Sequence, residues 1–229
     1  MKILLINGSP HSNGCTNRAL IEIKNTLERE GVDSEILHVP ADATGCRACG
    51  ACRKGKNGCA FGYNDGLNDA IRKMKECDGV ILGSPVYYSN ASGSLRAFAD
   101  RFFYAGSAFE GGVFEGKVGA AVANCRRGGA SATFEQLNQY FLISKMIVPA
   151  SQYWNQTHGN RVEEIEKDEE GLQTMRTLAL NTAWILKCIN AGKAAGIERP
   201  RFESQIKTNY FFHKLYKTLL YSLFFSFLI

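Results

Sequence analysis

The chain has 229 residues, of which 45% are hydrophobic and 21% are charged. This composition excludes a disordered or collagen-like protein, and the length favours one α/β domain with a substantial core over two small domains. The net charge is +5, but three of the 27 basic side chains lie in residues 204–229, which contain no acidic residue. Residues 1–203 therefore carry 24 basic against 22 acidic side chains, and this balance excludes the basic footprint of a nucleic-acid-binding protein.

Apolar runs of strand length alternate with segments of helical period along most of the chain. We expect strands at residues 2–7, 34–39, 79–82, 118–124 and 146–153, and helices at residues 16–30, 67–76, 94–104, 133–144 and 169–192. This alternation is typical of a parallel sheet covered by helices on both faces. It predicts a flavodoxin-like, doubly wound α/β fold with a five-stranded sheet in the order 2-1-3-4-5, and with a ligand at the carboxyl ends of the strands.

The first expected strand follows Met1 directly and is far shorter than the apolar region of a signal peptide. We therefore expect a cytoplasmic protein whose eight cysteines are reduced and available to a metal.

The loop after the first strand, residues 8–17, consists of small, hydroxylated and turn-forming residues that lead into a helix. Free backbone N–H groups at such a helix start favour an anion, and the hydroxyls of Ser9, Ser12 and Thr16 can add hydrogen bonds. The alternative is a capped turn without a ligand, because Ser, Asn and Thr are common capping residues. The loop is neither G-x-G-x-x-G nor a Walker loop. Of the phosphate ligands, flavin mononucleotide fits best.

The loops after the third and fourth strands have a composition that suits a planar heterocycle. Pro85 stiffens the first of them, Tyr87 and Tyr88 offer flat faces, and the backbone near Ser89 can bond a polar ring edge. The alternative is that these tyrosines are ordinary core or surface aromatics. After the fourth strand, residues 124–130 again place glycine and polar backbone at a strand end.

Taken together, three motifs resemble the NADPH-dependent FMN reductase family, and more narrowly its iron-sulfur flavoprotein branch. They are Gly8-Ser-Pro-x-x-x-Gly-x-Thr16, Ser84-Pro-Val-Tyr87 with Asp100-Arg101, and Cys125-Arg-Arg-Gly-Gly129. The resemblance covers roughly residues 1–203 and implies FMN, with its phosphate on residues 9–16 and its ring against residues 85–90 and 124–129. The candidate FMN-binding residues are Ser9, His11, Ser12, Cys15, Thr16, Asn17, Pro85, Val86, Tyr87, Tyr88, Ser89, Asn124, Arg126 and Gly128.

The chain departs from the family pattern at two positions in the first loop. His11 stands where the family commonly has arginine, and Cys15 where it commonly has asparagine. Because histidine lacks the permanent positive charge of arginine, we expect phosphate binding to be weaker and more dependent on pH.

Four cysteines lie within fourteen residues of the loop after the second strand: Cys46, Cys49, Cys52 and Cys59. Three cysteines at successive x2 spacings and a fourth further on are typical of a [4Fe–4S] cluster, whereas zinc sites more often use two separated C-x2-C pairs. Residues 45–60 also contain four basic side chains and no carboxylate, which suits a negatively charged cluster. A zinc site and a reduced loop without metal remain the alternatives. The family resemblance favours the cluster.

These patterns predict an FMN-dependent oxidoreductase or electron-transfer flavoprotein that also carries a [4Fe–4S] cluster. The alternatives are a cluster-free NAD(P)H-dependent FMN quinone or nitro-compound reductase, and a zinc-stabilised binding module. No set of catalytic side chains is recognisable, so the chemistry is expected to come from the cofactors. We expect a small-molecule or protein electron donor and acceptor, with NAD(P)H and ferredoxin as candidates, and the resemblance implies a homo-oligomer.

The last part of the chain differs from the rest. We expect an FMN-binding domain over residues 1–203, including the cysteine loop 45–60, and a hydrophobic extension over residues 204–229. Residues 218–229 carry no charge but are too short, at about 18 Å of helix, to cross a hydrocarbon core of about 30 Å. The favoured interpretation is a peripheral element that is not needed for cofactor binding. The alternatives are an interfacial membrane anchor and a non-native extension from a shifted reading frame.

Overall fold

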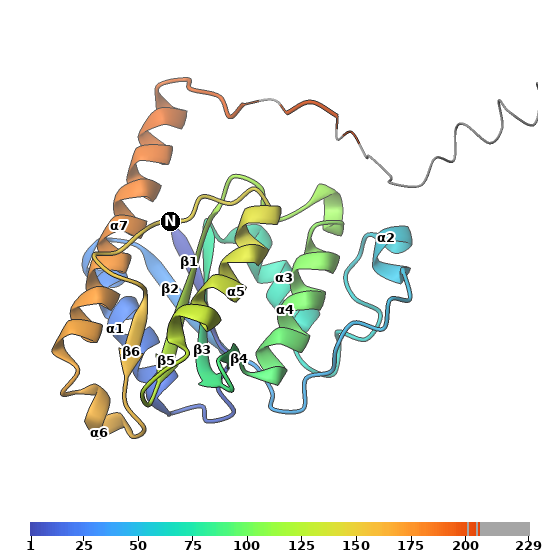
Figure 1. Cartoon of the computed structure of the whole chain (residues 1–229). Helices are drawn as coiled ribbons and strands as arrows, with labels where there is room; N and C mark the ends of the chain where they lie inside the picture. The colour runs from blue at the N-terminus through green and yellow to red at the C-terminus, as the bar shows by residue number, and fades with distance from the viewer. Residues whose placement is uncertain (201, 205, 207–229) are drawn as a thin grey trace, which may run out of the picture. The chain divides into compact units, whose positions relative to one another are not determined.

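The computed structural model describes residues 1–200, 202–204 and 206 (Figure 1). The strands are β1 (Lys2–Asn7), β2 (Asp33–His38), β3 (Gly79–Tyr87), β4 (Asn90–Ala91), β5 (Val118–Cys125) and β6 (Gln156–His158). The helices are α1 (Cys15–Arg29), α2 (Ala51–Gly55), α3 (Leu67–Glu76), α4 (Gly93–Gly106), α5 (Ala130–Ile143), α6 (Val162–Ile165) and α7 (Glu169–Ala194), with a 3-10 turn at Phe109–Gly111.

The sheet runs β2-β1-β3-β5-β6 with every neighbouring pair parallel. Successive side chains of a strand point to opposite faces. Leu4 and Ile6 of β1 therefore pack in one core with α3, α4 and α5, whereas Ile3 and Leu5 pack in a second core with α1 and α7. The expected doubly wound, flavodoxin-like sheet with helices on both faces is confirmed.

The fifth parallel strand lies later in the chain than predicted. The apolar run at residues 146–153 makes a single parallel bridge, between Ile147 and Val118, and the paired strand forms only at Gln156–His158. Proline lacks the N–H group that a sheet requires, and Pro149 follows the bridge by two residues. The prediction for residues 146–153 was wrong because it followed hydrophobicity past this proline.

The third strand is longer than predicted and ends in a hairpin. Residues 83–87, expected to be a loop, continue β3, and Val86 pairs antiparallel with Ala91 of β4. Tyr88 and Ser89 form the two-residue turn, both with positive φ (50° and 59°), as a hairpin turn of the primed type requires. Residues 83–87, which were expected to form a ligand-binding loop, are therefore part of a paired strand.

The chain divides into two units, Met1–Ile197 and Glu198–Ile229. Most of the hydrophobic extension predicted for residues 204–229 lies outside the described residues. Within the part of the chain that the structure describes, no helix has both the length and the apolar character needed to cross a bilayer.

Candidate functional site

A cavity of about 400 Å³ lies at the carboxyl ends of β1, β3 and β5. Its wall is formed by the connection after β1 with the start of α1, by the last residues of β3, by the end of β5 with the loop that follows it, and by the segment after β6. The lining residues are Ser9, His11, Gly14, Cys15, Thr16, Pro85, Val86, Tyr87, Asn124, Arg126, Gly159, Asn160, Arg161 and Val162. The cavity occupies the place where ligands bind in doubly wound folds.

The loop after β1 is held by the buried side chain of Asn7. Its Oδ1 accepts a hydrogen bond from the Ser9 N–H (3.0 Å), and its Nδ2 donates to the Ser12 carbonyl (3.3 Å). On the other side, His38 Nε2 lies 2.7 Å from the Ser9 carbonyl oxygen. These contacts curve the chain around the cavity before α1 begins.

The start of α1 is an open N-terminus. Gly14 occupies the capping position, no side chain among the described residues caps the helix, and the first turn contains no acidic residue. The first backbone N–H groups of α1 therefore remain available to an anion, with the positive end of the helix dipole behind them.

Ser92 joins the loop after β1 to α4. Its hydroxyl donates to the Gly8 carbonyl (2.5 Å) and accepts from the Leu95 N–H (3.2 Å), which caps α4. A Cβ atom at Gly8 would lie 2.5 Å from Leu95 Cβ. Glycine is required at position 8 because α4 approaches the loop this closely.

The charged side chains of the cavity wall are basic. Arg126 and Arg161 line it together with His11, and its described lining includes no aspartate or glutamate. Burial raises the pKa of the Cys15 thiol, which keeps this residue uncharged near neutral pH. The wall therefore favours a ligand with negative charge.

A charged network holds the segment after β6 against α1. Arg18 of α1 pairs with Glu166, just after α6, through Nε to Oε1 (2.5 Å) and Nη2 to Oε2 (3.0 Å). Glu22 binds both Arg18 (2.9 Å) and Arg176 of α7 (2.7 Å). Burial of Glu22 opposes its ionisation, but the two guanidinium groups hold its pKa below the usual value. The network fixes α6 and, with it, Arg161.

The four cysteines of the loop between β2 and α3 line a second, smaller pocket. Arg101 and Tyr104 of α4 form part of its wall, together with Arg47 and Phe61. Cys46 and Cys49 are exposed, Cys59 is half-buried and Cys52 is buried. Burial, with the neighbouring Cys59, raises the pKa of the Cys52 thiol.

Arg47 and Arg53 of the cysteine loop each make a cation–π contact with an aromatic ring. The Arg47 guanidinium lies 4.4 Å from the centre of the Phe61 ring, and the Arg53 guanidinium lies 4.2 Å from that of Tyr104. Within the described residues, no three His, Cys, Asp or Glu side chains are gathered in a way that would hold one metal ion.

The profile of the NADPH-dependent FMN reductase family matches residues 1–161. An iron-sulfur flavoprotein of Methanocaldococcus jannaschii is 33% identical over 197 residues, covering 82% of this chain and 99% of the relative. The chain belongs to the NADPH-dependent FMN reductase family. Within this family it falls in the iron-sulfur flavoprotein branch.

Further comparisons agree with this assignment. An iron-sulfur flavoprotein of Methanosarcina thermophila is 27% identical over 196 residues, covering 84% of this chain and 99% of the relative. Among solved structures, a flavodoxin from the domain Archaea gives a TM-score of 0.55 at 16% identity over 82% of this chain and 99% of that one, and supports the fold alone. As a member of the FMN reductase family, the chain is a flavin-dependent oxidoreductase or electron carrier.

The cavity at the strand ends gathers nine of the fourteen candidate residues from three separate segments of the chain. These are Ser9, His11, Cys15, Thr16, Pro85, Val86, Tyr87, Asn124 and Arg126. Ser12, Asn17, Tyr88, Ser89 and Gly128 do not line it. Tyr88 is fully exposed at the tip of the hairpin, and Ser89 packs against Gly129, where a Cβ would lie 2.8 Å from the Ser89 hydroxyl.

The sequence analysis missed the side of the cavity that is formed by residues 159–162. Because the fifth strand was expected at residues 146–153 and the next helix at residues 169–192, residues 159–162 lay in an unassigned segment. A basic residue, Arg161, directly after the turn-forming pair Gly159-Asn160 was the sequence signal that could have indicated this part of the site.

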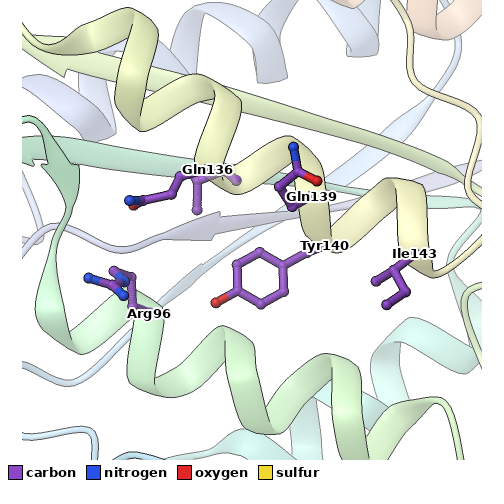
Figure 2. A pocket seen from close by; sticks show the side chains of 6 residues that line it. Arg96, Gln136, Gln139, Tyr140 and Ile143 are labelled. Carbon is purple, nitrogen blue, oxygen red and sulfur yellow. The ribbon is translucent and has the colours of Figure 1, made fainter. Parts of the chain in front are cut away.

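A third cavity, of about 410 Å³, lies between α4 and α5 and is lined by Arg96, Gln136, Leu137, Gln139, Tyr140 and Ile143 (Figure 2). The Tyr140 hydroxyl donates to Asp100 Oδ1 (2.5 Å), and its ring stacks on Phe103. Burial and the Asp100 carboxylate raise the Tyr140 pKa. Among the described residues, the cavity shares no lining residue with the cavity at the strand ends, and we interpret it as a groove between packed helices.

Proposed function

We propose that the cavity at the strand ends binds FMN and that the cysteine pocket holds a [4Fe–4S] cluster, so that the protein transfers electrons between a donor and an acceptor. One observation carries the FMN assignment: candidate residues from the loop after β1 and from the carboxyl ends of β3 and β5 converge on one cavity whose charged lining is basic. Phosphate and a planar polar ring are the groups that such a wall can hold.

The phosphate is assigned to the start of α1. Backbone N–H groups at Cys15 and Thr16, the buried hydroxyls of Ser9 and Thr16, and the guanidinium of Arg161 supply donors at that end of the cavity. The ring is assigned to the wall made by Pro85, Val86 and Tyr87 and to the side of Asn124, whose Nδ2 is held by Thr157 at 3.1 Å. The protein thus orients the cofactor and supplies its electrostatic surroundings.

The donor set of the second pocket fits an iron-sulfur cluster. Four thiols share one pocket, its described lining contains no carboxylate, and Arg47 and Arg101 lie in the same wall. In a four-iron cluster each thiolate binds a different iron, so its ligands are spread more widely than the four ligands of one zinc ion. The spacing of the four cysteines, three at successive x2 intervals and a fourth further on, supports the cluster over zinc. Cys46, Cys49, Cys52 and Cys59 would be its ligands.

When bound, FMN exchanges one or two electrons and the cluster passes them singly. NAD(P)H or reduced ferredoxin is the proposed donor, in a cytoplasm that keeps thiols reduced, and the working unit is proposed to be a homo-oligomer. The specific acceptor would approach the exposed aromatic rim at Tyr87, which is 45% exposed.

Anaerobic purification of the full chain, followed by assays for iron, acid-labile sulfide, zinc and FMN, tests the proposal. We expect iron, sulfide and FMN together. FMN without iron would support the cluster-free reductase, and zinc without flavin would support the binding module. An anaerobic titration with NADH, NADPH and reduced ferredoxin then identifies the donor by which of them bleaches the flavin absorbance.

Replacement of Thr16 by valine is expected to weaken FMN binding. Thr16 is 1% exposed and lines the cavity at the start of α1, so the variant keeps the shape and removes one donor to a charged phosphate. Such a hydrogen bond is worth about 1.5 kcal/mol or more, which corresponds to a dissociation constant raised about tenfold. The control is Thr26→Val in the same helix, whose hydroxyl donates to the Glu22 carbonyl away from the cavity. Equal FMN dissociation constants in the two variants would show that the phosphate does not bind at Thr16.

Replacement of Arg161 by glutamine should weaken FMN binding by a smaller factor. Arg161 is exposed at the cavity rim, and an exposed ion pair contributes up to about 1 kcal/mol, a factor of about five. The dependence of the FMN constant on salt should also become shallower. Arg127→Gln is the control, because Arg127 is also exposed but does not line the cavity. If both variants lost the same affinity, overall charge rather than Arg161 would be responsible.

A further inference from the structure

The buried side chain of Asn68 holds the backbone of Cys59 from both sides. Asn68, in the first turn of α3, is 2% exposed. Its Oδ1 accepts a hydrogen bond from the Cys59 N–H (2.8 Å), and its Nδ2 donates to the Cys59 carbonyl (2.9 Å). The amide thus forms a two-point contact with a single residue, and that residue is a proposed cluster ligand.

Two glycines make room for this contact. A Cβ atom at Gly62 would lie 2.7 Å from Asn68 Oδ1, and a Cβ atom at Gly58 would lie 2.5 Å from the same atom. Gly58 also has a positive φ of 107°, whereas Gly62 does not, so at Gly62 close approach alone requires glycine. The segment on both sides of Cys59 is shaped around the Asn68 amide.

A second contact fastens the same segment from α4. The guanidinium of Arg101 donates to the Phe61 carbonyl (3.3 Å) and pairs with the carboxylate of Asp65. Arg101 is 2% exposed. Asp65 in turn accepts from the Leu67 N–H at the start of α3 (3.4 Å). The chain from Cys59 to α3 is therefore bound to two helices.

The other side of the cysteine pocket is joined to the Cys59 segment by the contact of the Arg47 guanidinium with the Phe61 ring. Cys46 and Cys49 are exposed and lie in a stretch, residues 43–50, without helix or strand. The pocket has a free volume of about 20 Å³, which is room for one water molecule. A four-iron cluster can enter only if one side of the pocket moves outward.

We propose that Asn68 is a positioning residue for the cysteine site: it fixes Cys59, next to the buried Cys52, as the preformed half onto which the segment with Cys46 and Cys49 closes. This inference rests on the proposed cluster function. A group that hydrogen-bonds to a metal ligand orients that ligand before the metal binds. Removal of such a group commonly lowers the affinity for the metal. This role would explain why the polar side chain of Asn68 is buried in the first turn of the amphipathic helix α3.

The test combines two readouts on three variants, Asn68→Ala, Asn68→Asp and Gly62→Ala. The first removes both hydrogen bonds, and the second places a carboxylate oxygen against the Cys59 carbonyl. Gly62→Ala leaves Asn68 in the chain but displaces its amide. The control is Gly45→Ala, in the same loop, where a Cβ atom would meet no atom within 4 Å and φ is not positive.

In reduced, cluster-free protein, we expect Cys59 to react with iodoacetamide more slowly than Cys46 and Cys49 in the unmodified chain. In the three variants its rate should rise about tenfold, toward that of the exposed cysteines, because the loss of buried hydrogen bonds lets the segment open. Peptide mass spectrometry gives the rate at each cysteine. Gly45→Ala should leave the Cys59 rate unchanged.

After anaerobic reconstitution, the three variants should hold less iron and sulfide, with an altered electron paramagnetic resonance spectrum of the reduced cluster, while FMN affinity stays unchanged. A parallel loss of FMN in Asn68→Ala would indicate general unfolding. The Gly62→Ala variant would then be the one that tests whether the Asn68 amide positions Cys59. Unchanged Cys59 reactivity and full cluster content in Gly62→Ala would overturn the inference. If the unmodified chain binds no iron, the cluster proposal fails, and the alkylation rates still test the position of Cys59.

Discussion

Replacing Cys49 or Cys52 by alanine is expected to abolish the iron-sulfur cluster while changing the FMN dissociation constant by no more than about twofold. Removing one of four thiolates leaves an iron without its protein ligand. FMN should be retained because the two pockets share no lining residue in the described part of the chain. Iron and sulfide assays, with a fluorescence titration of FMN, measure both results on one preparation.

The two cysteine variants should differ in stability even though both lose the cluster. Cys52 is 8% exposed and packs in the core that contains α3, α4 and α5, whereas Cys49 is exposed. Cys52→Ala should therefore lower the melting temperature slightly, and Cys49→Ala should not. Cys188→Ala, on the exposed surface of α7, is the control and should keep the full iron content. Full iron and sulfide in either Cys49→Ala or Cys52→Ala would refute the proposed ligand set.

Replacing Arg101 by methionine should lower the free energy of unfolding by about 3–5 kcal/mol, because it leaves the carboxylate of Asp65 without its partner in a largely buried position. The side chains of Arg101 and Asp65 are 2% and 11% exposed. The Phe61 carbonyl loses a donor in the same variant. Urea unfolding followed by circular dichroism gives the change.

The double variant Arg101→Met with Asp65→Asn should recover part of this loss, since the unpaired charge is then removed. Arg72→Met serves as the control. Arg72 pairs with Asp69 on the exposed face of α3, where both side chains are more than half exposed, and should cost less than about 0.5 kcal/mol. A loss in Arg101→Met no larger than that in Arg72→Met would show that the buried pair contributes little.

The parallel core was predictable because each buried strand is a continuous apolar run followed by a turn and an amphipathic helix. Two features were not. The hairpin of β3 and β4 turns at Tyr88 and Ser89, which lack the Asn-Gly or Asp-Gly signal that usually marks such a turn. The fifth strand pairs over only three residues, Gln156–His158, which are polar and give no hydrophobic signal.

For the candidate site, the residues in short motifs near the strand ends were easier to predict than the residues that hold the cysteine loop from neighbouring helices. Ser9 lies just after β1, Thr16 at the start of α1 and Asn124 near the end of β5, and the topology places them at one edge of the sheet. Asn68 and Arg101 carry no such signal, because an asparagine or arginine on a helix usually faces water. Only the tertiary packing of α3 and α4 against the cysteine loop turns them inward.

The continuation of β3 into a hairpin bears on the thermodynamics of ligand binding. A loop that wraps a flat ring must give up backbone freedom when the ring arrives, and this entropic cost is subtracted from the affinity. Pro85 and Val86 instead stand on a strand that is already paired, with Pro85 beside Asn124 and Val86 opposite Ala91. The strain of two positive φ angles at the hairpin tip is borne by the folded chain before binding. If the FMN ring binds against this strand as proposed, little of its contact energy is lost to ordering the backbone, which favours tight retention of the flavin through many turnovers.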